Sequence, residues 1–206
     1  MNSCLPALRL PLLVLCTLVL SACPAPPPGT LHSLQPIRQQ PLGQDFAGFA
    51  EMILLMPVQL APQLQGRGLV DRHAGGEAHT SATHLWAGPL DQQIGQQLVN
   101  NLKDLLATDH VALYPGPRFG TVRYQLEIEM NEFSGNGQTF TTVAVHTVSD
   151  ANTKIMLTRK TFRQTRPIDK PDYSGYVASG SQAIADLSKE AAAALLAARR
   201  SQPATK

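Results

Sequence analysis

The chain has 206 residues, of which 43% are hydrophobic and 16% are charged. This composition is ordinary for a folded globular domain and too apolar for a disordered chain. The formal net charge is only +2 and there is no basic block, so nothing indicates binding to nucleic acid or to anionic lipid. After the first 22 residues no apolar run approaches the roughly 18 residues that span a bilayer, which excludes an integral membrane protein.

The first 22 residues have the pattern of a secretory signal. Arg9 supplies a positive charge, and an apolar run follows at residues 10–20. Residues 20–23 read Leu-Ser-Ala-Cys, which resembles the lipobox of bacterial lipoproteins, where the cysteine is acylated. We therefore expect cleavage after Ala22 and lipidation of Cys23, with an ordinary secretory signal as the alternative.

Cys23 is the only cysteine of the mature chain, because Cys4 and Cys16 lie in the signal. Acylation, for example with palmitate, leaves no thiol for a disulfide, a metal site or a nucleophile. Pro24 follows it, whereas an Asp there would resemble the inner-membrane retention signal of Gram-negative lipoproteins. These features predict an outer-membrane lipid anchor on the periplasmic face. The proline-rich residues up to 29 predict a short polyproline II tether.

We expect a single domain over residues 30–200, followed by a frayed tail at 201–206. A weak strand is expected at 30–37. The first clear strand is the continuous apolar run at 51–58, which suits a central strand covered on both faces. Residues 60–88 are rich in Gly, Pro and His and are expected to be irregular.

Two amphipathic helices are predicted. The first begins at Pro89, because proline suits a first helical turn and Asp91 favours the positive end of the helix dipole. Its apolar stripe consists of Leu90, Ile94, Leu98, Leu102 and Leu105 or Leu106. The second helix is capped by Asp172. Its stripe consists of Tyr173, Val177, Gly180, Ile184, Leu187, Ala191 and Leu195.

Between the helices the sequence predicts a short strand at 110–114 and then an antiparallel meander. Residues 121–131 alternate between apolar and polar, which predicts a strand buried on one face. Ser134-Gly135-Asn136-Gly137 is a strong turn signal, and strands are expected at 138–149 and 154–164. Two amphipathic helices and one doubly covered strand indicate a three-layer α/β/α sandwich on a mixed sheet of about five strands.

The best candidate for a metal site is the group His73, Glu77, His79 and His84, since imidazole and carboxylate suit zinc. Its spacing matches no short ligand pattern, so we prefer to interpret these residues as exposed loop side chains. The sequence also lacks a nucleophile elbow and a phosphate-binding loop. We therefore expect no metal, no cofactor and no enzymatic activity.

The only tryptophan, Trp86, lies just before the first predicted helix. It either plugs the core at the start of that helix or anchors an interface, because tryptophan is favoured at both kinds of position. We prefer the core interpretation.

Several motifs, in order, resemble the ABC-type transport auxiliary lipoproteins, also called paraquat-inducible protein C-like or DUF330 lipoproteins. The most specific is Trp-Ala-Gly-Pro-Leu at residues 86–90. The others are residues 57–62 and 64–72, residues 101–106, Tyr114-Pro115, Asp172-Tyr173 and Leu187-Ser188. Two features depart from the family pattern: Gly88 stands where an acidic residue is common, and residues 61–64 are a loose Pro-x-x-Leu.

The resemblance implies a fold similar to anticodon-binding or TolB amino-terminal domains. It also implies the role of an outer-membrane subunit in an MCE-type phospholipid transport system that supports envelope integrity. Such a subunit would form a homo-oligomeric ring and bind the periplasmic MCE-domain protein of an ABC lipid transporter. No catalytic residue is carried over.

The interface candidates that follow are Trp86, Leu64, Arg72 and Tyr114. The segment 60–88 and the turn at 134–137 are the expected docking and subunit surfaces. The alternative function is a cell-envelope scaffold lipoprotein that activates a peptidoglycan synthase or supports secretion.

Overall fold

The computed structural model describes residues 29–42, 51–72, 75–117 and 120–201. The predicted signal with Ala22, the lipidation site Cys23, nearly all of the tether and the tail after Ser201 lie outside the described residues. Within the described part, no helix is long and apolar enough to cross a membrane.

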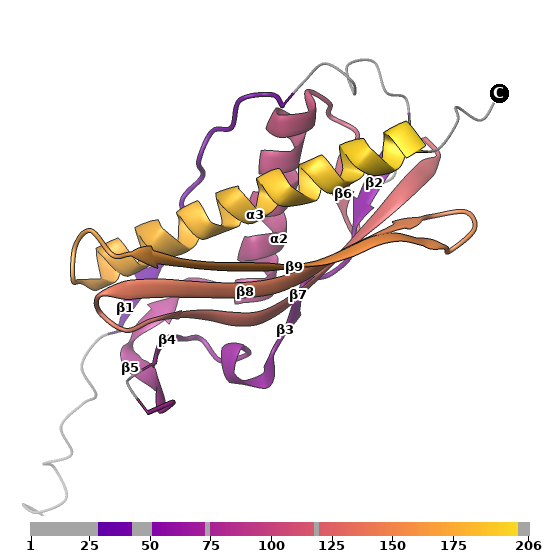
Figure 1. Cartoon of the computed structure of the whole chain (residues 1–206). Coiled ribbons are helices and arrows are strands. Elements are labelled where there is room, and N and C mark those ends of the chain that lie inside the picture. Colours follow the sequence, from indigo (N-terminus) through magenta and orange to yellow (C-terminus); the bar gives the residue numbers. More distant parts are fainter. Residues whose placement is uncertain (1–28, 43–50, 73–74, 118–119, 202–206) are drawn as a thin grey trace, which may run out of the picture.

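Over these residues the chain forms one nine-stranded sheet and two long helices (Figure 1). The strands are β1 (Thr30–His32), β2 (Met52–Leu55), β3 (Gln59–Leu60), β4 (Gly68–Arg72), β5 (Ala78–Trp86), β6 (Val111–Leu113), β7 (Val122–Gly135), β8 (Thr139–Asp150) and β9 (Met156–Pro167). The helices are the short η1 (Pro62–Leu64), α2 (Leu90–Leu106) and α3 (Tyr173–Ser201). Both long helices were predicted from their apolar stripes and are confirmed.

The long strand β7 organises the sheet. Along one edge it pairs antiparallel with β8, which pairs antiparallel with β9. Along its other edge it pairs in parallel with β2, then β3, then β4. β6 continues the sheet beyond β2, and β5 and β1 continue it beyond β4. The expected mixed sheet is therefore confirmed, but the expected number of about five strands is wrong.

The prediction of an irregular segment at 60–88 is also wrong, because this segment contains β4 and β5. β4 and β5 form an antiparallel pair, and only the last three residues of β5 pair with β1. The first half of β5 is therefore a sheet edge, and its side chains are mostly exposed. An exposed edge strand needs no alternation of apolar and polar residues, so the sequence of β5 lacks the pattern from which a strand is predicted.

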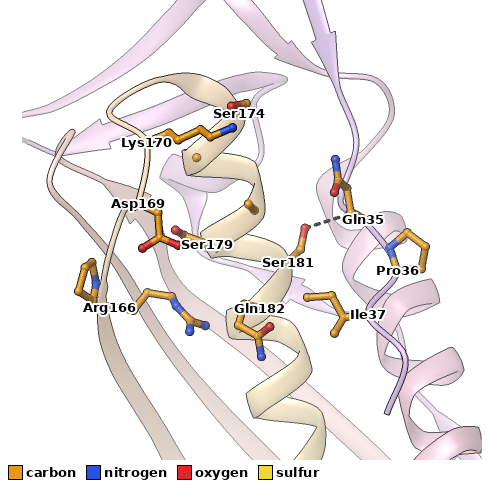
Figure 2. A pocket seen from close by; sticks show the side chains of 13 residues that line it. Gln35, Pro36, Ile37, Arg166, Asp169, Lys170, Ser174, Ser179, Ser181 and Gln182 are labelled. Carbon is orange, nitrogen blue, oxygen red and sulfur yellow. Dashed lines mark hydrogen bonds between the residues drawn. The ribbon is translucent and has the colours of Figure 1, made fainter.

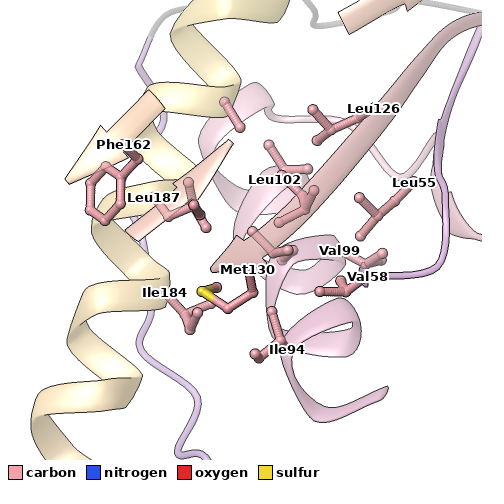
Figure 3. Close-up of a cluster of buried hydrophobic side chains, with 14 of the residues drawn as sticks. Leu55, Val58, Ile94, Val99, Leu102, Leu126, Met130, Phe162, Ile184 and Leu187 are labelled. Atoms are coloured by element: carbon pink, nitrogen blue, oxygen red, sulfur yellow. The ribbon is translucent and has the colours of Figure 1, made fainter. Parts of the chain in front are cut away.

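Both helices pack on the same face of the sheet. The amide of Asn101 on α2 donates a buried hydrogen bond of 3.0 Å to the Ser188 hydroxyl on α3. Leu126 and Met130 of β7 lie in the core beneath residues of both helices (Figure 3). The molecule therefore has two layers, and the expected three-layer sandwich is wrong. An amphipathic stripe shows that one side of a helix is buried, but not against which face of the sheet. The similarity to anticodon-binding or TolB amino-terminal domains stays a prediction.

Candidate functional site

Motifs that are far apart in the sequence meet at the start of α2. The parallel strands β2 and β6 pair Leu55 with Leu113, so their carboxyl ends lie together, where ligands commonly bind in α/β proteins. The residues that follow these ends and the first two turns of α2 enclose a groove of about 550 Å³. This α2 groove is lined by Pro57, Val58, Asp91, Gln92, Gln93, Gln96, Leu113, Tyr114 and Pro115.

Gly95 allows α2 to approach the ends of these strands closely. A Cβ atom on Gly95 would lie 3.2 and 3.3 Å from the two terminal methyl groups of Leu113. Amide side chains form one wall of the α2 groove, while proline and Tyr114, which is 39% exposed, contribute to the other. Asp91 and Tyr114 are the only ionisable residues in the lining. This composition suits an extended polypeptide and provides no nucleophile with a neighbouring base.

A second groove, of about 670 Å³, lies between the segment at residues 35–37, the first turns of α3 and the loop that follows β9 (Figure 2). The backbone N–H of Gln35 donates a 2.9 Å hydrogen bond to the Ser181 hydroxyl across it. Arg166, Asp169 and Lys170 give the lining both signs of charge. The second groove is therefore polar, with two basic side chains and one acidic side chain in its lining.

The histidine group does not come together as a metal site. His73 lies outside the described residues. His79 forms an exposed pair with Glu77 at 3.6 Å, whereas His84 contacts a different histidine, with its Nδ1 3.0 Å from Nε2 of His32. In the described part of the chain, no three His, Cys, Asp or Glu side chains are placed to hold one metal ion.

His32 and His84 instead belong to a stacked cluster where β1 meets β5. The His84 ring stacks on Tyr173 with centroids 3.6 Å apart, and the two imidazoles hydrogen-bond each other. Burial, and then the neighbouring His84, lowers the pKa of His32. This favours the neutral form of His32 at neutral pH, in which the pair holds β1 onto the sheet.

The four interface candidates occupy two kinds of position. Trp86 and Leu64 are each 2% exposed and lie in the core. The Trp86 ring centroid lies 6.2 Å from that of Phe133, which agrees with the preferred core interpretation. Arg72 and Tyr114 reach the surface, and Arg72 forms a 3.3 Å ion pair with Glu132. An interface role for these residues stays a prediction.

Sequence reasoning missed an aromatic cluster at the β7–β8 turn. Phe133 and Phe140 flank this turn and meet edge to face, with ring centroids 4.8 Å apart, and Phe140 meets Tyr176 of α3 in the same way at 4.9 Å. The buried Tyr176 hydroxyl donates a 2.9 Å hydrogen bond to the carbonyl of Val70, and burial raises its pKa. The signal was a phenylalanine on each side of a predicted Asn-Gly turn.

A second residue that sequence reasoning missed is His146 on β8. His146 faces the core and is fully buried, and neither ring nitrogen has a hydrogen-bond partner among the described residues. Burial lowers its pKa. Burial therefore favours the neutral form of this histidine, and its two ring nitrogens, without partners in the described part of the chain, are costly for the fold.

Comparisons with known proteins identify the family. The sequence profile of the ABC-type transport auxiliary lipoprotein component matches residues 32–192. A protein from Xanthomonas campestris of the DUF330 family has a similar structure, with a TM-score of 0.72 and 17% identity over 84% of this chain and 98% of that one. An uncharacterised protein of known structure gives a TM-score of 0.68 and 19% identity over 82% and 99%. No functionally curated protein matches. The chain belongs to the family of ABC-type transport auxiliary lipoprotein components, as its motifs predicted.

Proposed function

We propose that this protein is the outer-membrane lipoprotein subunit of an MCE-type intermembrane phospholipid transport system. The family match over residues 32–192 carries the proposal, because the family is an auxiliary component of ABC-type transport. The lipobox ending at Cys23, followed by Pro24 in place of an aspartate, supports attachment to the outer membrane with the domain in the periplasm.

The proposed role is docking without catalysis, in support of envelope integrity. The α2 groove has a mixed polar and apolar lining with Asp91 as its one acidic residue, as expected of a surface that binds a polypeptide. Two motifs of the family resemblance contribute to its lining, the first at residues 57–62 and the second at Tyr114-Pro115, and the motif at 86–90 leads directly into the helix that forms its other wall. We assign the α2 groove as the main contact with a periplasmic MCE-domain protein.

A homo-oligomeric ring is the second part of the proposal. Several lipid-anchored copies in one assembly gain avidity for the membrane that a single copy lacks. The two expected subunit surfaces also lie side by side, because Asp71 in the segment 60–88 pairs with Gly135 in the turn region. This end of the sheet therefore supports one continuous surface for a neighbouring copy.

Co-purification with the MCE-domain protein of the host tests the proposal. Gln96→Arg puts a long cation into the α2 groove and should sharply reduce recovery of the MCE-domain protein. Lys170→Glu in the second groove is the matched control and should leave recovery unchanged. Light scattering on the same samples measures the oligomeric state.

A strict monomer that binds none of the host's MCE-domain proteins would contradict the proposal. Recovery of a penicillin-binding protein instead would support the alternative, a cell-envelope scaffold. Equal recovery by the Gln96→Arg variant and the wild-type chain would keep the transport role but move the contact away from the α2 groove.

A further inference from the structure

The sheet has a long free edge at β9. Over its 12 residues β9 pairs with β8 on one side, and none of the described residues pairs with it on the other. Figure 1 shows β9 at the border of the sheet, with α3 running along it. An unpaired edge presents backbone N–H and C=O groups that can accept another strand.

The helix layer extends past this edge. A groove of about 530 Å³ runs between β9 and the second half of α3. In the wall formed by α3, Ala194 and Ala198 are buried, whereas Ala193 and Ala197 are exposed. Part of α3 is therefore left uncovered beside β9, and its small alanine side chains leave room for the side chains of a further strand.

The charge on β9 restricts what can pair with it. β9 carries Arg159, Lys160, Arg163 and Arg166 and no acidic residue. Arg159 and Arg166 form ion pairs with Glu129 and Asp186, whereas Lys160 and Arg163 are exposed and form none among the described residues. These side chains lie on both faces of β9, with Arg159 and Arg163 on the outer face and Lys160 and Arg166 on the face toward α3. Like charges on facing strands are destabilising, so the exposed Lys160 and Arg163 oppose pairing with a second β9, and Arg163 favours an acidic segment on the outer face.

Other occupants fit the edge poorly. The tether at residues 24–28 is mostly proline, which cannot donate ladder hydrogen bonds. A second copy could offer β1 or β6, which are each only three residues long, or the free first half of the nine-residue β5. None of these matches a 12-residue edge, so we take the occupant to be a segment of a different protein.

We infer that the β9 edge binds an extended, acidic segment of a partner protein as an additional strand. Acidic side chains of the incoming strand lie on the outer face of the sheet, on the side of Arg163. Small apolar side chains lie on the other face, against Ala193 and Ala197. On that face Lys160 and Glu190 line the groove with opposite signs, so their charges balance. The inference goes beyond the proposed transport role and does not depend on it.

The test uses the full chain, expressed with its signal and purified in detergent, and a fluorescent 12-residue peptide of alternating Val and Glu. We expect saturable binding and slower hydrogen exchange at the amides of β9. A peptide with Lys in place of Glu should bind at least about tenfold more weakly, because it faces like charge. An acidic peptide with proline at alternate positions should not protect the β9 amides.

Two variants of the protein separate strand addition from general charge attraction. Ala197→Phe fills the groove and should weaken binding of the Val-Glu peptide at least about tenfold. Ala178→Phe is the matched control, because Ala178 is also an exposed alanine of α3 but lines the second groove. This variant should bind the Val-Glu peptide as the wild-type chain does. Arg163→Glu should shift the preference toward the Lys peptide.

Equal binding of the Val-Glu peptide by Ala197→Phe and Ala178→Phe would overturn the inference. Protection of amides outside β9 would also overturn it. If the wild-type chain self-associates and Ala197→Phe alone disperses it, the occupant is a second copy and the assignment to a different protein is wrong.

Discussion

Trp86 connects several elements at one point of the core. It is the last residue of β5 and directly precedes the turn into α2. Its backbone N–H donates a 2.7 Å hydrogen bond to the backbone carbonyl of Arg67. The backbone N–H of Ala87 donates one to the backbone carbonyl of His32. Its ring packs between Phe133 and Tyr176. The side chain therefore fills the space where β4, β5, β7 and α3 meet.

Trp86→Ala should lower the free energy of unfolding by about 3–5 kcal/mol, because a large buried ring leaves a cavity that the surrounding side chains fill only in part. Chemical denaturation of the purified chain measures this. The exposed Tyr114→Ala is the control and should change stability by less than about 0.5 kcal/mol. Unchanged stability of Trp86→Ala, with loss of assembly, would show that Trp86 acts as an interface anchor.

His146 should make stability depend on pH. Its pKa in the folded chain lies below the ordinary value of 6.5, mainly through burial, with Glu190 raising it and Lys160 lowering it. At a pH between the pKa of His146 in the folded chain and its pKa in the unfolded chain, the unfolded chain binds more protons than the folded chain. The unfolding free energy therefore keeps its full value above about pH 6.5. Below this pH it falls, with a limiting slope of about 1.4 kcal/mol per pH unit.

Denaturation of wild type and His146→Leu between pH 5 and 8 isolates this contribution. The pKa of His32 is also lowered, so its contribution remains in both proteins and cancels in the difference. The difference in unfolding free energy should be flat above pH 7 and should grow in favour of His146→Leu toward pH 5. Parallel pH profiles for the two proteins would contradict the prediction.

The helices and the central strand could be predicted from the sequence because each has a buried face with a strict period. β7 alternates over Tyr124, Leu126, Ile128 and Met130, and all four are buried. β4 and β5 could not be predicted, because β4 has five residues and half of β5 is exposed. The placement of both helices on one face of the sheet could not be predicted either. It depends on contacts between α2 and α3, such as that of Asn101 with Ser188, which are 87 positions apart in the sequence.

The α2 groove was only partly predictable for the same reason. The motifs that line it were recognised one by one, and Tyr114 was selected as a candidate. Their meeting point depends on the parallel pairing of β2 with β6, which places Leu55 opposite Leu113. In the sequence, Gln92 and Gln96 fit the polar side of an amphipathic helix, and nothing local distinguishes a groove wall from a solvated face.

The contact between the helices gives a prediction at the level of elements. The Ser188 hydroxyl accepts from the Asn101 amide and donates a 2.7 Å hydrogen bond to the carbonyl of Ile184. Ser188→Ala removes the acceptor and leaves the buried amide unsatisfied, so we expect a loss of about 1–3 kcal/mol in unfolding free energy. Calorimetry or chemical denaturation measures it.

Replacing both partners should restore much of the stability. In Asn101→Leu with Ser188→Ala, no buried polar side chain lacks a partner at this contact, and apolar surface packs between α2 and α3. The double variant should therefore be more stable than Ser188→Ala alone. Additive losses in the two single variants would show that the hydrogen bond does not couple the helices.

At the scale of the whole molecule, the segment after β1 is tied across both helices. The backbone N–H of Leu34 donates to Gln93 of α2, that of Gln35 to Ser181 of α3, and that of Leu42 to the carbonyl of Leu105. Figure 1 shows β1 and the β8–β9 turn at opposite ends of the molecule. The predicted lipid anchor at Cys23 precedes β1 in the sequence, so we expect the β8–β9 turn to be directed away from the membrane.

The anchor itself gives the last prediction. Cys23→Ser removes the thiol that acylation requires, so the protein should accumulate as an uncleaved precursor or as soluble periplasmic protein. Cys16→Ser, inside the predicted signal, is the matched control and should leave the protein in the outer-membrane fraction. Fractionation with immunodetection measures both. Cys23 would be the only cysteine left after the predicted cleavage, so a reducing agent should not change the melting temperature of the acylated protein. Equal amounts of wild type and Cys23→Ser in the outer membrane would mean that another attachment holds the protein there.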